Sequence, residues 1–148
     1  MKKKIAIIAC TIAMVSYAGC CTKKDCRTLD DLVEIQLVNF AGDEVDSLTI
    51  EIFSDSLTTR LDSVFSTATI SGGYMAVDIP GELNLDHFYR ITNHSTGQSD
   101  VMGHFNSKKL KCNTCFPNKT KGYITTLDNY VLNGDTYNEE VLSIAKRP

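Results

Sequence analysis

The sequence lacks the features that mark several common protein classes. After the first 18 residues, no run is long or apolar enough to span a bilayer, which takes about 20 residues. No basic stripe with interleaved aromatic residues is present, so nucleic acid is not an expected partner. The phosphate-binding loop, the Gly-x-Ser-x-Gly elbow and the His-Glu-x-x-His zinc motif are also missing. These absences argue against an integral membrane helix, a nucleic-acid binder and an enzyme of those classes.

The residues that most often carry catalysis or bind metals are also poorly arranged. His87, His94 and His104 lack metal-ligand spacing and have no evident nucleophile beside them. The acidic pairs Asp30-Asp31 and Glu139-Glu140 are adjacent in sequence, and neighbours in a strand point to opposite faces. We therefore expect no catalytic residues, no metal site and no cofactor, and a protein that is not an enzyme.

The first segment has the pattern of a secretory signal. Three lysines follow Met1, and the chain is then apolar from Ile5 to Ala18, ending in small residues. Two cleavage positions compete. Ser16-Tyr17-Ala18 is an ordinary small-x-small site, which would release a soluble domain. Ala18-Gly19-Cys20 is the alternative, in which Cys20 becomes the first residue.

The second alternative rests on a resemblance. Ala18-Gly19-Cys20 resembles the bacterial lipobox, although Tyr17 stands where that motif usually has Leu, Val or Ile. The resemblance implies that Cys20 is the lipidation site, carrying palmitate-type acyl chains. Stable anchoring takes more than one such chain. Removal of residues 1–19 takes away three lysines and no acid, which leaves 12 basic and 18 acidic residues and a formal net charge of −6.

The remainder of the chain predicts an all-β fold. Apolar and polar residues alternate with a period of two in short segments, and turn-forming residues separate them. The segments 32–40 and 48–53 are expected to form a hairpin, and helix is expected only in short pieces such as 84–87. Asn133-Gly134 is the clearest hairpin turn. The sequence thus predicts a single antiparallel β-sandwich of seven to nine short strands, with a small barrel as the alternative. Further strands are expected at 57–65, 74–79, 87–92, 99–105, 122–127, 130–132 and 140–145.

This pattern gives a simple domain organisation. Residues 1–19 are the expected signal peptide, 20–31 a lipidated tether, and 32–148 one β-sandwich domain. The segment 108–121 is expected to be a loop.

Four cysteines remain if Cys20 is lipidated, namely Cys21, Cys26, Cys112 and Cys115. In an oxidising envelope, disulfides are the default. We favour a staple that joins Cys26 to Cys112 or Cys115, worth about 4–5 kcal/mol because the loop it closes is long. A structural zinc site or a redox pair at Cys112 and Cys115 is the alternative.

Two further surface features are noted. Asp-Ser-aliphatic tripeptides place Ser47, Ser56 and Ser63 in a motif that resembles the O-glycosylation acceptor of Bacteroidota envelope proteins, whereas Asp and Ser also suit turns. Five lysines surround the cysteine loop and are either a solvated surface or a docking patch for an acidic partner or lipid headgroups. They are Lys108, Lys109, Lys111, Lys119 and Lys121.

Taken together, these features resemble the small uncharacterised lipoproteins of the Bacteroidota envelope. The resemblance implies an immunoglobulin-like or transthyretin-like sandwich held at the outer membrane by its N-terminal lipid. It implies a non-catalytic binding or accessory module with an envelope protein or a glycan as partner. The alternatives are an accessory subunit of a surface fibre, and a secreted domain with a cysteine-based metal or redox site.

Overall fold

The computed structural model describes residues 28–71, 73–111 and 123–148, and these contain ten strands and two short 3₁₀ helices. The helices are η1 (Leu29–Asp31) and η2 (Gly42–Glu44). The strands are β1 (Glu34–Val38), β2 (Leu48–Phe53), β3 (Arg60–Ser66), β4 (Thr69–Ser71), β5 (Tyr74–Asp78), β6 (Phe88–Asn93), β7 (Ser99–Lys111), β8 (Tyr123–Leu132), β9 (Asp135–Tyr137) and β10 (Ser143–Ala145).

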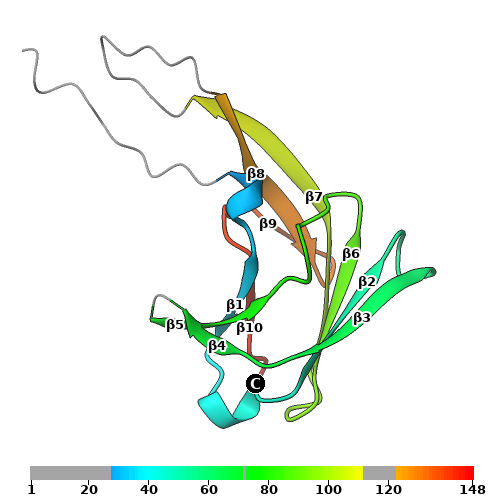
Figure 1. Cartoon of the computed structure of the whole chain (residues 1–148), viewed down its shortest axis with the longest axis vertical. Coiled ribbons are helices and arrows are strands. Elements are labelled where there is room, and N and C mark those ends of the chain that lie inside the picture. The colour runs from blue at the N-terminus through cyan, green and yellow to red at the C-terminus, as the bar shows by residue number, and fades with distance from the viewer. Residues whose placement is uncertain (1–27, 72, 112–122) are drawn as a thin grey trace, which may run out of the picture. The chain divides into compact units, whose positions relative to one another are not determined.

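The strands form two sheets, so the predicted all-β sandwich is confirmed (Figure 1). A four-stranded sheet has the order β10-β1-β5-β4, and a six-stranded sheet has the order β3-β2-β6-β7-β8-β9. Ten strands exceed the predicted seven to nine, and the three-residue β4 is one that the alternation pattern does not reveal. One pair also departs from the antiparallel expectation, since β1 and β10 run parallel, with Leu37 beside Ile144.

The core lies between the two sheets and takes inward-facing residues from both. Ile35 and Leu37 alternate with exposed or half-buried neighbours on β1, as period two requires. Leu48 and Ile50 enter the core from β2, where Thr49 between them is also buried. The most deeply buried large side chains are Tyr89, Tyr130, Ile35, Leu48, Ile50, Met102, Leu127, Leu142, Ile144 and Val77.

Two buried tyrosines connect the core to the turns above it. The hydroxyl of Tyr89 accepts a hydrogen bond from the backbone N–H of Asn84 at 2.9 Å, and that of Tyr130 accepts one from the N–H of Ser143 at 3.1 Å. Burial raises the pKa of both phenols. Phe105 lies between them, with ring centroids 5.9 Å from Tyr89 and 6.3 Å from Tyr130. The two hydroxyls therefore act as hydrogen-bond acceptors for backbone N–H groups in the turn at Asn84 and at the start of β10.

The predicted hairpin between the first two strands is wrong. β1 pairs with β5 and β10, whereas β2 pairs with β3 and β6, so the two strands lie in different sheets. The connection between them contains η2 and the buried side chain of Val45. Because this connection carries its own apolar contact with the core, it crosses from one sheet to the other and does not turn back as a tight loop.

Other local predictions fare differently. Asn133 and Gly134 have φ values of 54° and 97° and join β8 to β9, which confirms the predicted hairpin turn. The prediction of a loop that begins at residue 108 is wrong, because β7 continues to Lys111. Residues 84–87 form a turn, closed by a hydrogen bond from the N–H of His87 to the carbonyl of Asn84 at 3.2 Å.

The described residues 28–71, 73–108 and 125–148 belong to one compact unit, which builds the sandwich. Described residues 109–111 and 123–124 fall in a second unit. Leu29 of η1 packs against the core. The described residues contain no helix with the length and apolar character that a bilayer crossing needs.

Candidate functional site

The outer face of the six-stranded sheet carries an ordered set of polar and aromatic side chains. On β2, Thr49, Glu51 and Phe53 alternate with the core residues and therefore point outward. Their neighbours across β2–β3 and β2–β6 are set by the register: Glu51 stands between Ser63 and Arg90. We call this surface, from β3 across β2 to β6, the outer face.

A charged cluster lies at the centre of the outer face. The carboxylate of Glu51 bonds Arg60 through Oε1 and Arg90 through Oε2, each at 3.1 Å. The Arg90 guanidinium also lies 4.9 Å from the ring centroid of Phe53, a cation–π contact. Phe53 is only 4% exposed, although it does not belong to the main core cluster. The cluster holds both guanidinium groups in place with one carboxylate.

A β-bulge makes this cluster possible. Ile52 pairs with Asp62, but Phe53 pairs with Arg60, so Leu61 is an extra residue on β3. Without this extra residue, Arg60 would lie on the face opposite to Phe53 and Glu51 and could not reach the Glu51 carboxylate. A bulge redirects side chains in this way. Its effect here is to place Arg60 within reach of Glu51.

A second row lies along the same face, towards the start of β2. Thr49 Oγ1 and His94 Nε2 are 2.7 Å apart, and the ring of Phe65 lies 6.1 Å from that of His94. Phe65 is 79% exposed, which is unusual for a large aromatic side chain. This row therefore ends in an exposed aromatic ring beside a hydrogen-bonded histidine.

Two pockets border the outer face. One has a volume of about 420 Å³, and its lining includes Ser47, Phe65 and Asp78. The other has a volume of about 450 Å³, and its lining includes Ser56, Phe88 and His104. His104 has a φ of 49° and meets Phe88 edge-on, with centroids 4.9 Å apart. In the described part of the chain, no group of three or more His, Cys, Asp or Glu residues could hold a metal ion.

The three candidate glycosylation serines are all exposed, but they do not share a site. Ser47 lies just before β2, Ser56 in the turn between β2 and β3, and Ser63 within β3. Near Ser56, Asp55 accepts hydrogen bonds from Thr58 and Thr59, which lower the pKa of its carboxyl group. Asp55 therefore acts as a turn residue, as the alternative interpretation of the motif proposes.

The lysine patch is described only in part. Lys108 Nζ lies 3.1 Å from Asp128 Oδ1 and 3.6 Å from Glu140 Oε1, and the bond to Asp128 raises the pKa of Lys108. Its charge is thus compensated locally, whereas Lys109 is exposed. The Lys111 side chain, Lys119 and Lys121 lie outside the description, as do Cys20 and the disulfide candidates Cys21, Cys26, Cys112 and Cys115.

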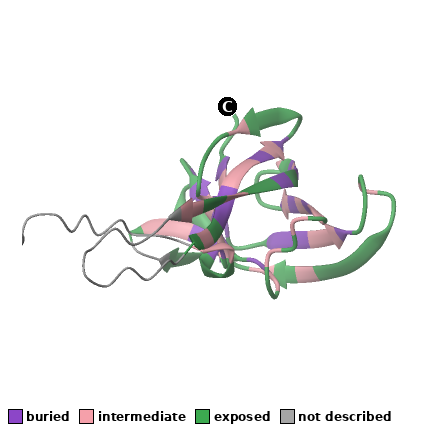
Figure 2. Cartoon of the chain, turned by 90° about the horizontal axis from the view of Figure 1, so that it is seen from above, coloured by how far each residue is buried: buried purple, intermediate pink, exposed green. Residues whose placement is uncertain are grey.

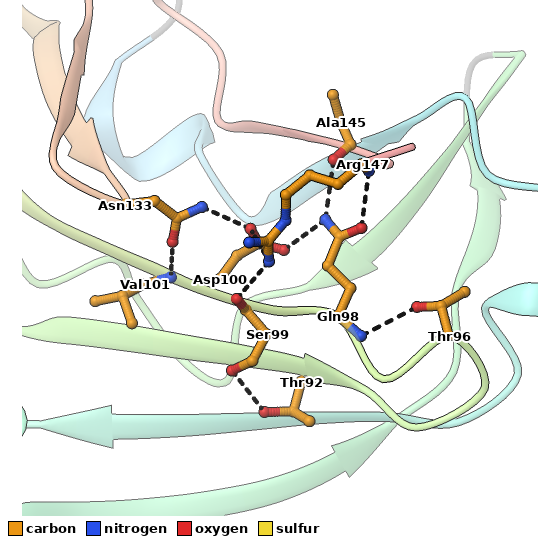
Figure 3. Close-up of polar contacts among 9 residues, drawn as sticks. All are labelled: Thr92, Thr96, Gln98, Ser99, Asp100, Val101, Asn133, Ala145 and Arg147. Atoms are coloured by element: carbon orange, nitrogen blue, oxygen red, sulfur yellow. Dashed lines mark hydrogen bonds and ion pairs between the residues drawn. The ribbon is translucent and has the colours of Figure 1, made fainter.

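A buried carboxylate holds the last described residues in place (Figure 3). Asp100 accepts hydrogen bonds from Gln98 and Asn133, each at 2.7 Å, and pairs with Arg147 at 3.1 Å. The same Gln98 bonds the carbonyl of Ala145 and the N–H of Arg147. All of these groups hold one another, so this network supports the fold and leaves the outer face as the better candidate site.

Sequence reasoning missed the outer-face cluster. Glu51 and Arg90 stand at alternating strand positions like many surface residues, and Arg60 reaches them only because of the bulge. A signal in the sequence was the outward position of Phe53, which the alternation already places opposite the core. No protein-family model, curated protein or solved structure matches the chain.

Proposed function

We propose that this chain is a non-catalytic lipoprotein of the bacterial envelope, anchored by Cys20 at the outer membrane, whose β-sandwich binds another envelope component through its outer face. The observation that carries the binding part is the exposed aromatic end of that face. Phe65 is 79% exposed and stands beside His94, which Thr49 holds at 2.7 Å. Exposed aromatic side chains beside fixed polar groups are common in recognition surfaces.

The charged cluster supports binding more than catalysis. Glu51 holds Arg60 and Arg90, and Arg60 keeps 60% of its side chain exposed. A guanidinium held by a carboxylate loses less conformational freedom when it meets a partner. Such a surface fits an envelope protein or a glycan, both of which offer oxygen acceptors to Arg60.

Photo-crosslinking in intact cells tests the binding part. A photoreactive amino acid at Phe65 is expected to give a discrete crosslinked product that contains an envelope component other than a second copy of this chain, because the side chain lies on the proposed surface. The matched control is Val33, which is 51% exposed and precedes β1 in the other sheet. Equal products from both positions, or none from Phe65, would contradict the outer face as the binding surface.

Intact mass of the mature protein extracted from membranes tests the anchor. The expected mass is that of a chain beginning at Cys20 with acyl chains attached, and hexose-type additions would report on Ser47, Ser56 and Ser63. A chain beginning at Gly19 without lipid would overturn the lipoprotein proposal and favour a secreted domain.

A surface-fibre accessory is the second candidate, and the β3 edge favours it. In the part of the chain that the structure describes, β3 has a strand partner on one side only. An open edge can accept a strand from another chain. Assembly of the purified protein into particles larger than a dimer, increasing with concentration, would favour this candidate.

A further inference from the structure

β3 differs from the other three sheet edges in length and exposure. The edges formed by β4, β9 and β10 are three residues long, whereas β3 has seven. Every described position of β3 is exposed or half-buried (Figure 2). A short edge strand offers few backbone groups to another chain, and a long exposed one offers several. Among the strands that stand last in their sheets, β3 therefore offers the longest row of backbone groups to another chain.

The hydrogen-bond alternation shows which backbone groups β3 offers. The N–H of His94 donates to the carbonyl of Ser47 at 2.9 Å, and this pair continues the β2–β6 ladder. Because bonded pairs alternate in antiparallel strands, Leu48 and every second residue after it bond towards β3. Their partners are Ser66, Val64 and Asp62. The backbone groups of Ser63 and Phe65 consequently point to the free edge.

A separate contact agrees with this orientation. The N–H of Ser63 donates to Oδ1 of the neighbouring Asp62 at 2.7 Å. The Asp62 carboxylate thus accepts the hydrogen bond from the central N–H of the free edge. Charged side chains are a common way of protecting edges, so Asp62 keeps this N–H from bonding another strand until the carboxylate moves away.

We propose that two copies of this chain pair through antiparallel β3 strands, in a register centred on Ser63. This register places Leu61 of each copy, the extra residue of the bulge, opposite Phe65 of the other copy, so the contact occurs twice. These are the two large apolar side chains that β3 leaves exposed, at 52% and 79%. Aromatic–aliphatic pairs across strands stabilise sheets.

The other pairs in this register bring together no like charges and no bulky side chains. Asp62 of each copy lies opposite Val64 of the other, so no two like charges face each other directly. Ser63 lies on the two-fold axis, where a small side chain meets its own copy. A two-fold interface needs this kind of self-complementarity, because the same patch serves both subunits. The second copy is therefore a better match than a strand of unrelated sequence.

Two features of β3 limit this pairing. The Asp62 carboxylate must first release the N–H of Ser63 before that N–H can bond the second copy. The natural chain is therefore expected to associate weakly, and Asp62→Ala is expected to strengthen association. A sugar on Ser63 would stand on the two-fold axis and prevent it. The inference goes beyond the proposed function, since it requires neither the lipid nor a different partner.

Cysteine trapping in the full mature chain, kept in its membranes, tests the register. Residues in a bonded antiparallel pair have Cα atoms about 5.5 Å apart, within the range that a disulfide spans. Ser63→Cys is expected to give a disulfide-linked dimer on a non-reducing gel, and Asp62→Ala in the same chain is expected to increase the yield several-fold. Ser66→Cys is the matched control on the same strand, because Ser66 lies opposite Arg60 and not opposite itself.

Each outcome decides the inference. A dimer from Ser63→Cys that exceeds the Ser66→Cys background several-fold supports it. Equal yields from both variants, no dimer even with Asp62→Ala, or a product with a different protein would overturn it. The mass result for the proposed function is independent of all these outcomes. A photo-crosslink from Phe65 to a second copy reports on the β3 pairing, and a photo-crosslink to another component reports on the proposed function.

Discussion

Arg147 lies 3.1 Å from the carboxylate of Asp100, which is 5% exposed and belongs to β7. The residue before it, Lys146, donates its N–H to the carbonyl of Val38 on β1 at 2.9 Å. These consecutive residues therefore join the four-stranded sheet to the six-stranded sheet. A buried carboxylate needs such partners because an unpaired charge in the interior is costly.

Asp100→Ala is expected to lower the free energy of unfolding by about 3 kcal/mol, since it removes a buried acceptor that the amides of Gln98 and Asn133 and the Arg147 guanidinium share. Arg147→Ala is expected to cost about 1 kcal/mol, because two amide donors to Asp100 remain. Urea unfolding monitored by circular dichroism measures both. A larger loss for Arg147→Ala than for Asp100→Ala would contradict the role of the buried carboxylate.

Gly103 is a position at which the fold excludes a side chain. A Cβ atom there would lie 2.3 Å from Cδ1 of the Phe88 ring. Gly103→Ala is therefore expected to lower the free energy of unfolding by about 1–3 kcal/mol through overpacking, as measured by thermal or urea unfolding.

Two variants control this prediction. Gly42→Ala, where nothing lies within 4 Å of the new Cβ, is expected to stay within about 0.5 kcal/mol of the natural chain. Phe88→Leu combined with Gly103→Ala is expected to recover part of the loss. If the two alanine variants are equally stable, the close approach of Phe88 is not what requires glycine.

The strand positions are predictable from the sequence to the extent that one face is buried. β2 begins and ends where the alternation predicts, because Leu48 and Ile50 enter the core while Thr49 and Glu51 do not. β8 is one strand from Tyr123 to Leu132, although Asp128-Asn129 interrupts the apolar pattern. In the structure Asp128 pairs with Lys108, and Asn129 bonds Asn106 at 2.8 Å, so cross-strand partners compensate for the missing apolar residues.

Strand partners and the candidate site are less predictable. Period two assigns residues to faces but does not say which strands pair, so the parallel contact of β1 with β10 at the far end of the chain has no local signal. The cluster at Glu51 depends on a bulge of one residue at Leu61. A single inserted residue changes the direction of Arg60, and no composition rule detects it.

The disulfide predicted from the sequence, between Cys26 and Cys112 or Cys115, stays a prediction. Peptide mapping of the unreduced mature chain is expected to find Cys26 linked to Cys112 or Cys115. Cys26→Ser is then expected to lower the free energy of unfolding by about 4 kcal/mol, because the natural staple closes a long loop. A link between Cys112 and Cys115, free thiols, or one bound zinc per chain would contradict the staple.

Glu44 links stability to pH. Its carboxylate bonds Lys146 Nζ at 2.6 Å and accepts the N–H of Ala41 at 2.8 Å, and the bond to Lys146, followed by that to Ala41, lowers the pKa of Glu44 below its ordinary value of 4.5. A group whose pKa is lower in the folded state contributes stability above its unfolded pKa and loses that contribution as the pH falls through the folded value. Glu44→Gln is therefore expected to lower the melting temperature near pH 7.

The difference between Glu44→Gln and the natural chain is expected to shrink as the pH falls below 4.5, because protonation then removes the same charge from Glu44. Melting temperatures measured by circular dichroism across this range provide the check. Glu82→Gln, which also removes one negative charge at an exposed turn position, is the control and is expected to show no comparable convergence. Parallel curves for Glu44→Gln and the natural chain would show that the bond between Glu44 and Lys146 does not stabilise the fold.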